Sequence, residues 1–134
     1  MSIQRYIQSV LLILGAFMEP NVKLGPSDFT GEHLNKRGTL AVLFAADWCP
    51  FCMRFVPIFN STITEKGLSG ALADLSDFEN SLWEVFGIQV VPTVMVFKEG
   101  VLVYRKDGVL GRGLPDNAMN EVVPYLSANH EGRS

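Results

Sequence analysis

One stretch decides the fold of the chain: Ala45-Ala46-Asp47-Trp48-Cys49-Pro50-Phe51-Cys52. Residues 40–44, directly before it, are apolar without alternation, which is typical of a strand buried on both faces. The residues after it carry apolar side chains at helical spacing, at positions 55, 56, 58 and 59. The sequence therefore predicts that Cys49 and Cys52 lie where a central strand ends and a helix begins.

The junction between strand and helix favours a charged sulfur at Cys49. Pro50 suits the first helical position, where no backbone N–H is needed, and this places Cys49 at the N-cap. The side chain of an N-cap residue meets free N–H groups and the positive end of the helix dipole, and both stabilise an anion. We therefore expect an exposed, reactive thiolate at Cys49, and a more buried Cys52 within reach to form a disulfide with it.

Composition narrows the class of protein. The chain has 134 residues, 48% of them hydrophobic and 19% charged, which fits one globular domain. Its formal net charge of −3 includes no basic excess, and this argues against binding nucleic acid. Both cysteines belong to one motif, a pattern that fits a reducing compartment such as the cytoplasm. We expect no cofactor and no metal, because His33 and His130 lack the spacing to complete a zinc site.

The N-terminal segment, residues 3–18, carries an apolar stripe at helical spacing and predicts an amphipathic helix. Three roles stay open: a helix that packs on the domain, on a partner or on a second subunit; a signal peptide for export; and a membrane anchor. No small-x-small cleavage site follows, and the apolar run Val10–Met18 is shorter than the roughly 20 residues that a membrane span needs. We therefore expect a helical extension at 1–20, a domain at 21–128 and a polar tail at 129–134, with no membrane span.

Periodicity and turn residues predict the other elements. Strands are expected at 22–24, 40–45, 71–75, 93–98 and 101–105, and helices at 27–37, 50–65, 82–86 and from Pro115 onward. Pro57 should kink the second of these helices, and His33 should be a solvated residue on the first. Because strands and helices alternate before a final hairpin and helix, the sequence predicts an α/β fold with a mixed sheet of about five strands flanked by helices.

Several separated features resemble the thioredoxin family. The stretch Trp48-Cys49-Pro50-Phe51-Cys52 after an apolar strand is similar to the family's active site, and Pro57 to its helix-kinking proline. The segment Val91-Pro92-Thr93 resembles its cis-proline segment, and Lys98-Glu99-Gly100 the turn that follows, with Gly108 at the usual spacing beyond. The resemblance covers most of the chain and implies a thioredoxin fold, to which an N-terminal helix is added.

The same resemblance implies a thiol–disulfide oxidoreductase that reduces protein disulfides. Cys49 would attack the substrate disulfide and Cys52 would resolve the mixed disulfide. The resulting redox-active disulfide, Cys49–Cys52, would be reduced by a donor similar to thioredoxin reductase. Backbone groups at Val91 would pair with an extended substrate segment. The substrate-binding groove implied by the resemblance consists of Trp48, Val91, Pro92 and Gly108.

Some positions depart from the family pattern and leave the activity open. Pro50-Phe51 stands where the family usually has Gly-Pro, and a proline–aromatic pair resembles glutaredoxins. Leu43 and Ala73 stand where many members have a buried Asp and its Lys partner. We hypothesise that water, or a carboxylate reached on docking, takes the proton of Cys52; Asp74 is a possible substitute, although it should face away from Ala73. Glutaredoxin-like, oxidase or isomerase activity and a non-enzymatic interaction module remain alternatives.

Overall fold

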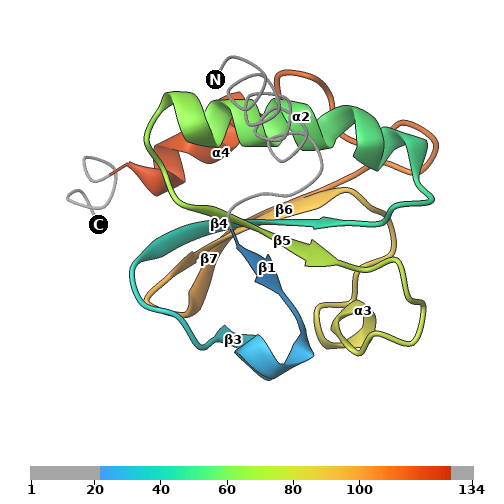
Figure 1. The fold of residues 1–134 in the computed structure, drawn as a ribbon, viewed down its shortest axis with the longest axis horizontal. Coiled ribbons are helices and arrows are strands. Elements are labelled where there is room, and N and C mark those ends of the chain that lie inside the picture. Colours follow the sequence, from blue (N-terminus) through green and yellow to red (C-terminus); the bar gives the residue numbers. More distant parts are fainter. Residues whose placement is uncertain (1–21, 128–134) are drawn as a thin grey trace, which may run out of the picture.

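The computed structural model describes residues 22–127, so the N-terminal helix expected at 1–20 and the polar tail at 129–134 lie outside the described residues. A mixed five-stranded sheet forms the middle layer (Figure 1). Its strands follow the order β1 (Lys23–Leu24), β5 (Gly70–Asp74), β4 (Thr39–Ala45), β6 (Thr93–Lys98) and β7 (Val101–Asp107).

Strand β4 is the centre of the sheet. It pairs in parallel with β5 and antiparallel with β6, so it has a neighbour on each side. Its residues from Ala41 to Phe44 are fully buried, which agrees with the uninterrupted apolar run in the sequence. The strand ends at Ala45, immediately before the two-cysteine stretch, and this confirms the predicted junction.

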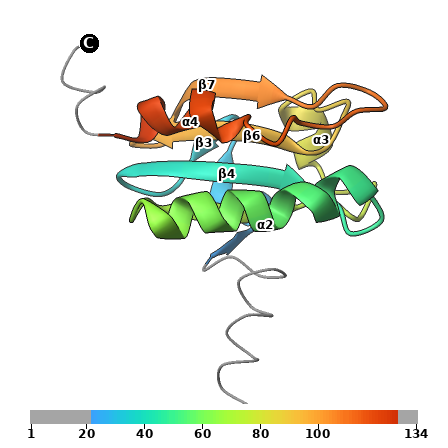
Figure 2. The ribbon, with the colours of Figure 1, turned by 90° about the horizontal axis from the view of Figure 1, so that it is seen from above.

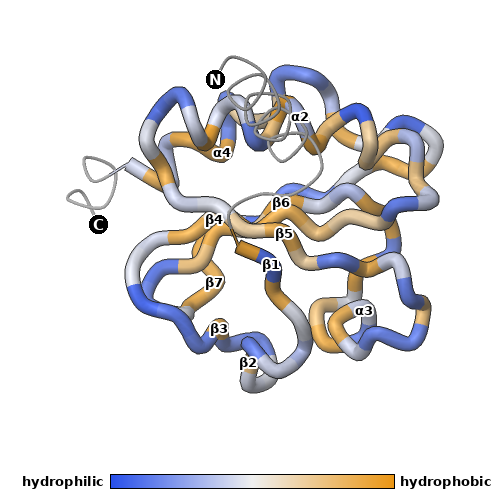
Figure 3. Tube along the Cα trace, in the orientation of Figure 1, coloured by the Kyte–Doolittle hydropathy of each residue, from blue (hydrophilic) through white to orange (hydrophobic). Residues whose placement is uncertain are grey.

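The helices cover both faces of the sheet. Helices α2 (Pro50–Glu65) and α4 (Met119–Leu126) lie together on one face, whereas α3 (Leu82–Val85) lies on the other (Figure 1 and Figure 2). Hydrophobic residues follow the inner strands, and hydrophilic residues gather in the peripheral turns (Figure 3). Burying each large apolar side chain contributes about 1.5–3 kcal/mol, so the apolar inner faces of α2 and α4 hold these two helices against the sheet. The buried residues on these faces include Cys52, Phe55 and Phe59 of α2 and Met119, Val122 and Leu126 of α4.

Four phenylalanine rings form the core on the α3 side of the sheet. Phe86 lies at the centre of this cluster, with ring centroids 5.4 Å from Phe29 and 5.5 Å from Phe44. Phe97 completes the cluster at 6.0 Å from Phe86. Because tilted and edge-on ring pairs add about 0.5–1.5 kcal/mol beyond burial, the cluster holds this layer against the sheet.

The prediction of a helix at 27–37 is wrong. The structure has a 3₁₀ turn, η1 (Pro26–Asp28), followed by a hairpin of β2 (Phe29–Thr30) and β3 (His33–Leu34). Phe29 and Leu34 lie opposite each other across this hairpin, and both are buried. Residues five apart point about 140° apart on a helix, so only the hairpin places both on the core side. His33 is exposed, as expected, but it lies on a strand.

The last helix also differs from its prediction, because α4 begins at Met119 and not at Pro115. The residues between form tight turns, in which the N–H of Ala118 bonds the carbonyl of Pro115 at 3.0 Å. Such i to i+3 bonds are typical of the tightened turns next to an α-helix. The other predicted elements are confirmed with small shifts at their ends, including the strand at 71–75 and the hairpin at 93–105.

Candidate active site

Cys49 occupies the N-cap of α2, with Pro50 at the first helical position, as the sequence predicts. The backbone N–H of Cys52 donates a hydrogen bond to Cys49 Sγ at 3.3 Å. This sulfur therefore meets a free donor of the first helical turn and lies at the positive end of the helix dipole. The arrangement can stabilise negative charge on the sulfur of Cys49.

Cys52 lies one turn further along the helix and is completely buried. The N–H of Ala46 donates to its sulfur at 3.5 Å. Burial raises the pKa of the Cys52 thiol well above its usual value, and the hydrogen bond with Cys49 raises it further. Cys52 is therefore held as a protonated thiol beneath the sulfur that meets the helix dipole.

Cys49 is less exposed than expected. Only 5% of its surface is accessible, against 0% for Cys52, although the order of the two agrees with the prediction. Its thiol donates to the carbonyl oxygen of Val91 at 3.5 Å, and Val91 lies just before the start of β6. Both cysteines are free thiols in this state, so the Cys49–Cys52 disulfide stays a prediction.

The expected cis-proline segment lies against the first cysteine. The peptide bond between Val91 and Pro92 is cis, and β6 starts at the next residue, Thr93. The hydroxyl of Thr93, which is buried, donates to the carbonyl of Val90 at 2.7 Å and closes the turn. The carbonyl of Val91 is thereby held beside the sulfur of Cys49.

Gly108, directly after β7, lies against the cis-proline segment. A Cβ atom at this position would lie 2.5 Å from the carbonyl oxygen of Pro92 and 3.2 Å from a methyl carbon of Val90. Only a residue without a side chain allows the backbone of the loop to approach the proline so closely. The structure thus brings together Cys49, Val91, Pro92 and Gly108, which are far apart in the sequence.

Trp48, directly before Cys49 in the sequence, belongs to a stack of three rings. Its ring lies 5.0 Å from that of Phe78 with planes 23° apart, and 6.4 Å from that of Trp83 with planes 8° apart. The indole N–H of Trp48 donates to the carbonyl of Ser76 at 2.9 Å, which fixes its orientation. We call Trp48, Phe78 and Trp83 the aromatic shelf; Phe78 is 72% exposed, an unusual position for a large apolar side chain.

Sequence reasoning interpreted Trp83 as packing and did not single out Phe78. The signal was present, because a phenylalanine stands among Ser76, Asp77 and Glu79 in a polar loop that follows a buried strand. The sequence does not show that this loop lies against Trp48, because the two stacked residues, Trp48 and Phe78, are 30 positions apart in the chain.

Within residues 22–127, no buried carboxylate takes the place of the Asp that the family resemblance leads one to expect. Leu43 and Ala73 are both fully buried and add no charge. Asp74, the possible substitute, is exposed, and its carboxylate accepts hydrogen bonds from the backbone N–H and the hydroxyl of Ser76. The hydroxyl oxygen of Ser76 in turn accepts the N–H of Asp47 at 2.8 Å. Asp74 thus supports the loop beside the site.

Residues 22–127 hold neither a metal-binding cluster nor a membrane-spanning helix. Within this part of the chain, no three His, Cys, Asp or Glu side chains are grouped so that they could hold a metal ion. None of the helices in the same range is long and apolar enough to cross a bilayer.

The strand order, the cysteine at a helix N-cap and the cis-proline beside it define a thioredoxin-fold protein with a Cys-Pro-Phe-Cys site. The family model for thioredoxin matches residues 21–118, and the chain belongs to the thioredoxin family. This relation supports thiol–disulfide oxidoreductase chemistry at a general level.

Comparison with individual proteins gives the same family. Thioredoxin of Mycobacterium tuberculosis is 27% identical over 107 residues, which cover 79% of this chain and 92% of that protein. Protein disulfide-isomerase like 2-2 of Arabidopsis thaliana is 33% identical over 82 residues, 60% of this chain and 18% of that protein. Protein disulfide-isomerase 2-3 of the same plant is 29% identical over 117 residues, 86% of this chain and 27% of that protein. The chain therefore spans less than a third of the length of these two isomerases.

A solved structure agrees with the fold. The N21Q mutant thioredoxin from Halobacterium salinarum NRC-1 superposes with a TM-score of 0.59 and 21% sequence identity. The match covers 79% of this chain and 90% of that chain. At this identity the likeness concerns the fold alone.

Proposed function

We propose that the protein reduces disulfides in other proteins, with Cys49 as the nucleophile and Cys52 as the resolving thiol. The observation that carries the proposal is the hydrogen bond from the Cys52 N–H to Cys49 Sγ at the start of α2. A donor in this position places a hydrogen bond on the sulfur that attacks the disulfide, and the helix N-terminus can stabilise the negative charge of the attacking form. The buried, protonated state of Cys52 supports its role as the second thiol to react.

The reaction proceeds by two exchanges. The thiolate of Cys49 attacks one sulfur of the substrate disulfide, the substrate S–S bond breaks, and the other substrate sulfur leaves and takes a proton. Cys52 then loses its proton and attacks Cys49 Sγ, which releases the second substrate thiol and forms the Cys49–Cys52 disulfide. Two electrons pass from the protein to the substrate. We propose that water, or a carboxylate of the docked partner, accepts the proton of Cys52.

The substrate would lie across the cis-proline segment. The carbonyl of Val91 is 3.5 Å from the sulfur of Cys49, so an extended segment that pairs with this backbone would bring its cystine to the nucleophile. Trp48 and Pro92 would flank this segment, and Gly108, which lies against the carbonyl of Pro92, would add no side chain beside it. Backbone pairing does not read sequence, and this suits many protein substrates.

The direction of electron flow separates the main alternatives. The matched relatives include both a thioredoxin and protein disulfide-isomerases. The match to thioredoxin spans 92% of that protein, and we therefore favour reduction. A redox titration against glutathione tests the choice, because thioredoxin has a potential of about −270 mV and protein disulfide isomerase about −180 mV. A value near the latter would favour oxidase or isomerase activity, and a preference for glutathione over thioredoxin reductase as donor would favour a glutaredoxin-like enzyme.

Insulin reduction with dithiothreitol as electron source tests the enzymatic proposal itself. We expect Cys49→Ser to abolish the acceleration over dithiothreitol alone, because Cys52, the other cysteine of the chain, is completely buried. If Cys49→Ser kept the full activity, the chain would have to act as an interaction module and not as a reductase.

We propose the cytoplasm as the compartment and a thioredoxin-reductase-like protein as the donor. The placement of both cysteines in one motif supports a reducing environment. Export or membrane association through residues 1–18 is the alternative, as is a role of this segment in binding a partner or a second copy. Fractionation of cells that express the full chain, with thiol trapping at lysis, would distinguish a reduced cytoplasmic pool from an exported one.

A further inference from the structure

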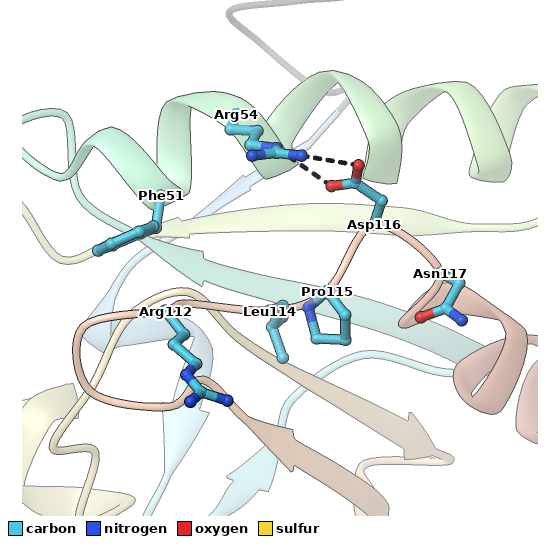
Figure 4. Close-up of a pocket in the computed structure, with 7 residues that line it drawn as sticks. All are labelled: Phe51, Arg54, Arg112, Leu114, Pro115, Asp116 and Asn117. Atoms are coloured by element: carbon cyan, nitrogen blue, oxygen red, sulfur yellow. Dashed lines mark hydrogen bonds and ion pairs between the residues drawn. The ribbon is translucent and has the colours of Figure 1, made fainter.

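A pocket of about 480 Å³ lies beside the cysteine motif, between the start of α2 and the loop that leads to α4 (Figure 4). This volume is within the range of small-ligand pockets. Helix α2 contributes one wall and the loop contributes the other. The residues on which the argument depends are Phe51, Arg54, Arg112, Leu114, Pro115 and Asp116.

One residue of the cysteine motif, Phe51, lines the pocket and places it next to the proposed substrate groove. Phe51 stands between the two cysteines and is 39% exposed. Gly113, which has a φ of +70°, passes so close that a Cβ there would lie 2.6 Å from the Cβ of Phe51. The other end of the same loop is Gly108, which lies against the carbonyl of Pro92. The loop therefore links the cis-proline to the wall of the pocket. A substrate that binds in the groove would extend toward the pocket.

The pocket has two positively charged side chains and one negatively charged side chain. Asp116 binds Arg54 through two hydrogen bonds, of 3.1 Å to Nε and 2.8 Å to Nη2, so these two residues neutralise each other. Arg112 is exposed, and its side chain forms no hydrogen bond or ion pair with any of residues 22–127. Figure 4 shows its guanidinium apart from the Arg54–Asp116 pair. One positive charge is thus left at the pocket, on a chain whose formal net charge is −3.

We propose that this pocket receives an acidic side chain that lies close to the cystine in a polypeptide substrate, and that Arg112 selects it. The proposal rests on the proposed reductase function. Phe51, Leu114 and Pro115 offer an apolar wall for the methylene groups of a glutamate, and a guanidinium matches the geometry of a carboxylate. Because Phe51, which lines the pocket, stands two residues after Cys49, we expect the acid within three residues of the attacked cysteine, a span of about 10 Å in an extended chain.

Pairs of disulfide peptides test this specificity. In each pair a Glu replaces a Gln at one position within three residues of the cystine, and the reduced protein is mixed with peptide in a single-turnover measurement. Each reaction passes two electrons from the Cys49–Cys52 dithiol to the peptide, so no other reductant is needed. We expect the Glu peptide to react about two- to fivefold faster at one of these positions, as for an exposed ion pair, and the ratio to fall as salt is added.

Charge variants assign the effect to the pocket. Arg112→Gln should bring the Glu/Gln ratio close to one, and Arg112→Glu should invert it. Asp116→Asn should increase the ratio, because it leaves Arg54 charged but without its partner. Arg37→Gln is the matched control, since Arg37 is an exposed arginine outside the pocket, paired with Glu99, and this variant should keep the ratio of the unmodified protein.

The outcomes separate this proposal from the proposed function. If the protein reduced neither peptide of any pair, the reductase function itself would fail. If it reduced both peptides equally at every position, or if Arg112→Gln kept the ratio, the reductase would stand and the pocket proposal would be overturned. A carboxylate could also come from glutathione disulfide. A loss of rate with that substrate in Arg112→Gln, together with an unchanged peptide ratio, would overturn the assignment to polypeptide acids.

Discussion

The sulfur of Cys49 lies 3.5 Å from the carbonyl oxygen of Val91, the residue that precedes the cis-proline. This contact joins the start of α2 to the start of β6, two points that meet because β4 and β6 are antiparallel neighbours. The backbone group that would hold a substrate and the sulfur that would attack it are thus fixed by the same central strand. The arrangement leads to predictions about each cysteine and about the surfaces that flank them.

Cys52→Ser should trap substrates as stable mixed disulfides on Cys49. Cys52 is the buried thiol one turn beyond the nucleophile, and without it no sulfur of the described site can resolve the first exchange. Mass spectrometry of complexes isolated under non-reducing conditions would measure the trapped fraction. Cys49→Ser is the matched control and should trap none; an equal yield from both variants would show that the roles of the two sulfurs are not those proposed.

The raised pKa of Cys52 predicts how the stability of the reduced protein depends on pH. Above about pH 8.5, where an ordinary cysteine ionises, the unfolded chain releases the proton of Cys52 while the folded chain retains it. The unfolded state then binds fewer protons, so the free energy of unfolding should fall as the pH rises beyond this point. Urea unfolding between pH 7 and pH 10 under reducing conditions would measure the slope.

Cys52→Ala provides the comparison for this pH dependence, because it removes the titrating group. The variant should lose less stability than the unmodified protein between pH 8.5 and pH 10. The same cause predicts that iodoacetamide modifies Cys52 slowly in the folded Cys49→Ser variant and rapidly once that variant is unfolded at pH 9. Equal alkylation rates in the two states would contradict a buried, protonated thiol.

Phe78→Ser should weaken the reduction of protein disulfides by several-fold and leave the reduction of a small aromatic disulfide reagent almost unchanged. Phe78 stacks on Trp48, the neighbour of Cys49 in the sequence, and is 72% exposed, so its ring is available to a large substrate. Because the substitution also removes the stacking of Phe78 on Trp83, we expect stability to fall by about 0.5–1.5 kcal/mol. Val101→Ser, at a 56% exposed position on the edge strand β7, is the control and should alter neither rate.

The stretch around the cysteines could be predicted from local pattern, and the place of Val91, Pro92 and Gly108 from the resemblance to the thioredoxin family. The contacts that Phe78 and Gly113 make could not be predicted. The strand–helix junction follows from an apolar run and from Pro50, both of which act locally. The hairpin at 29–34 has no local signal, because its two apolar residues, Phe29 and Leu34, lie on one side only when they pair across two strands. The stacking of Phe78 on Trp48 and the contact between Gly113 and Phe51 depend on how separate loops meet, which no local pattern records.

Gly108→Ala should disturb the groove although it adds only one methyl group. The new Cβ would lie 2.5 Å from the carbonyl oxygen of Pro92, a backbone atom that cannot rotate away as a side chain could. Either the loop or the cis-proline segment must therefore move, and overpacking of this kind costs about 1–3 kcal/mol of folding free energy. Because Cys49 contacts Val91, in the same segment, the rate of protein-disulfide reduction should fall together with stability. Gly25→Ala is the matched control, since a Cβ there meets nothing within 4 Å and the backbone has an ordinary φ of −128°. Denaturant unfolding and single-turnover reduction of both variants would show whether the loss is specific to residue 108; a fully stable and active Gly108→Ala would mean that the close approach of this loop does not shape the groove.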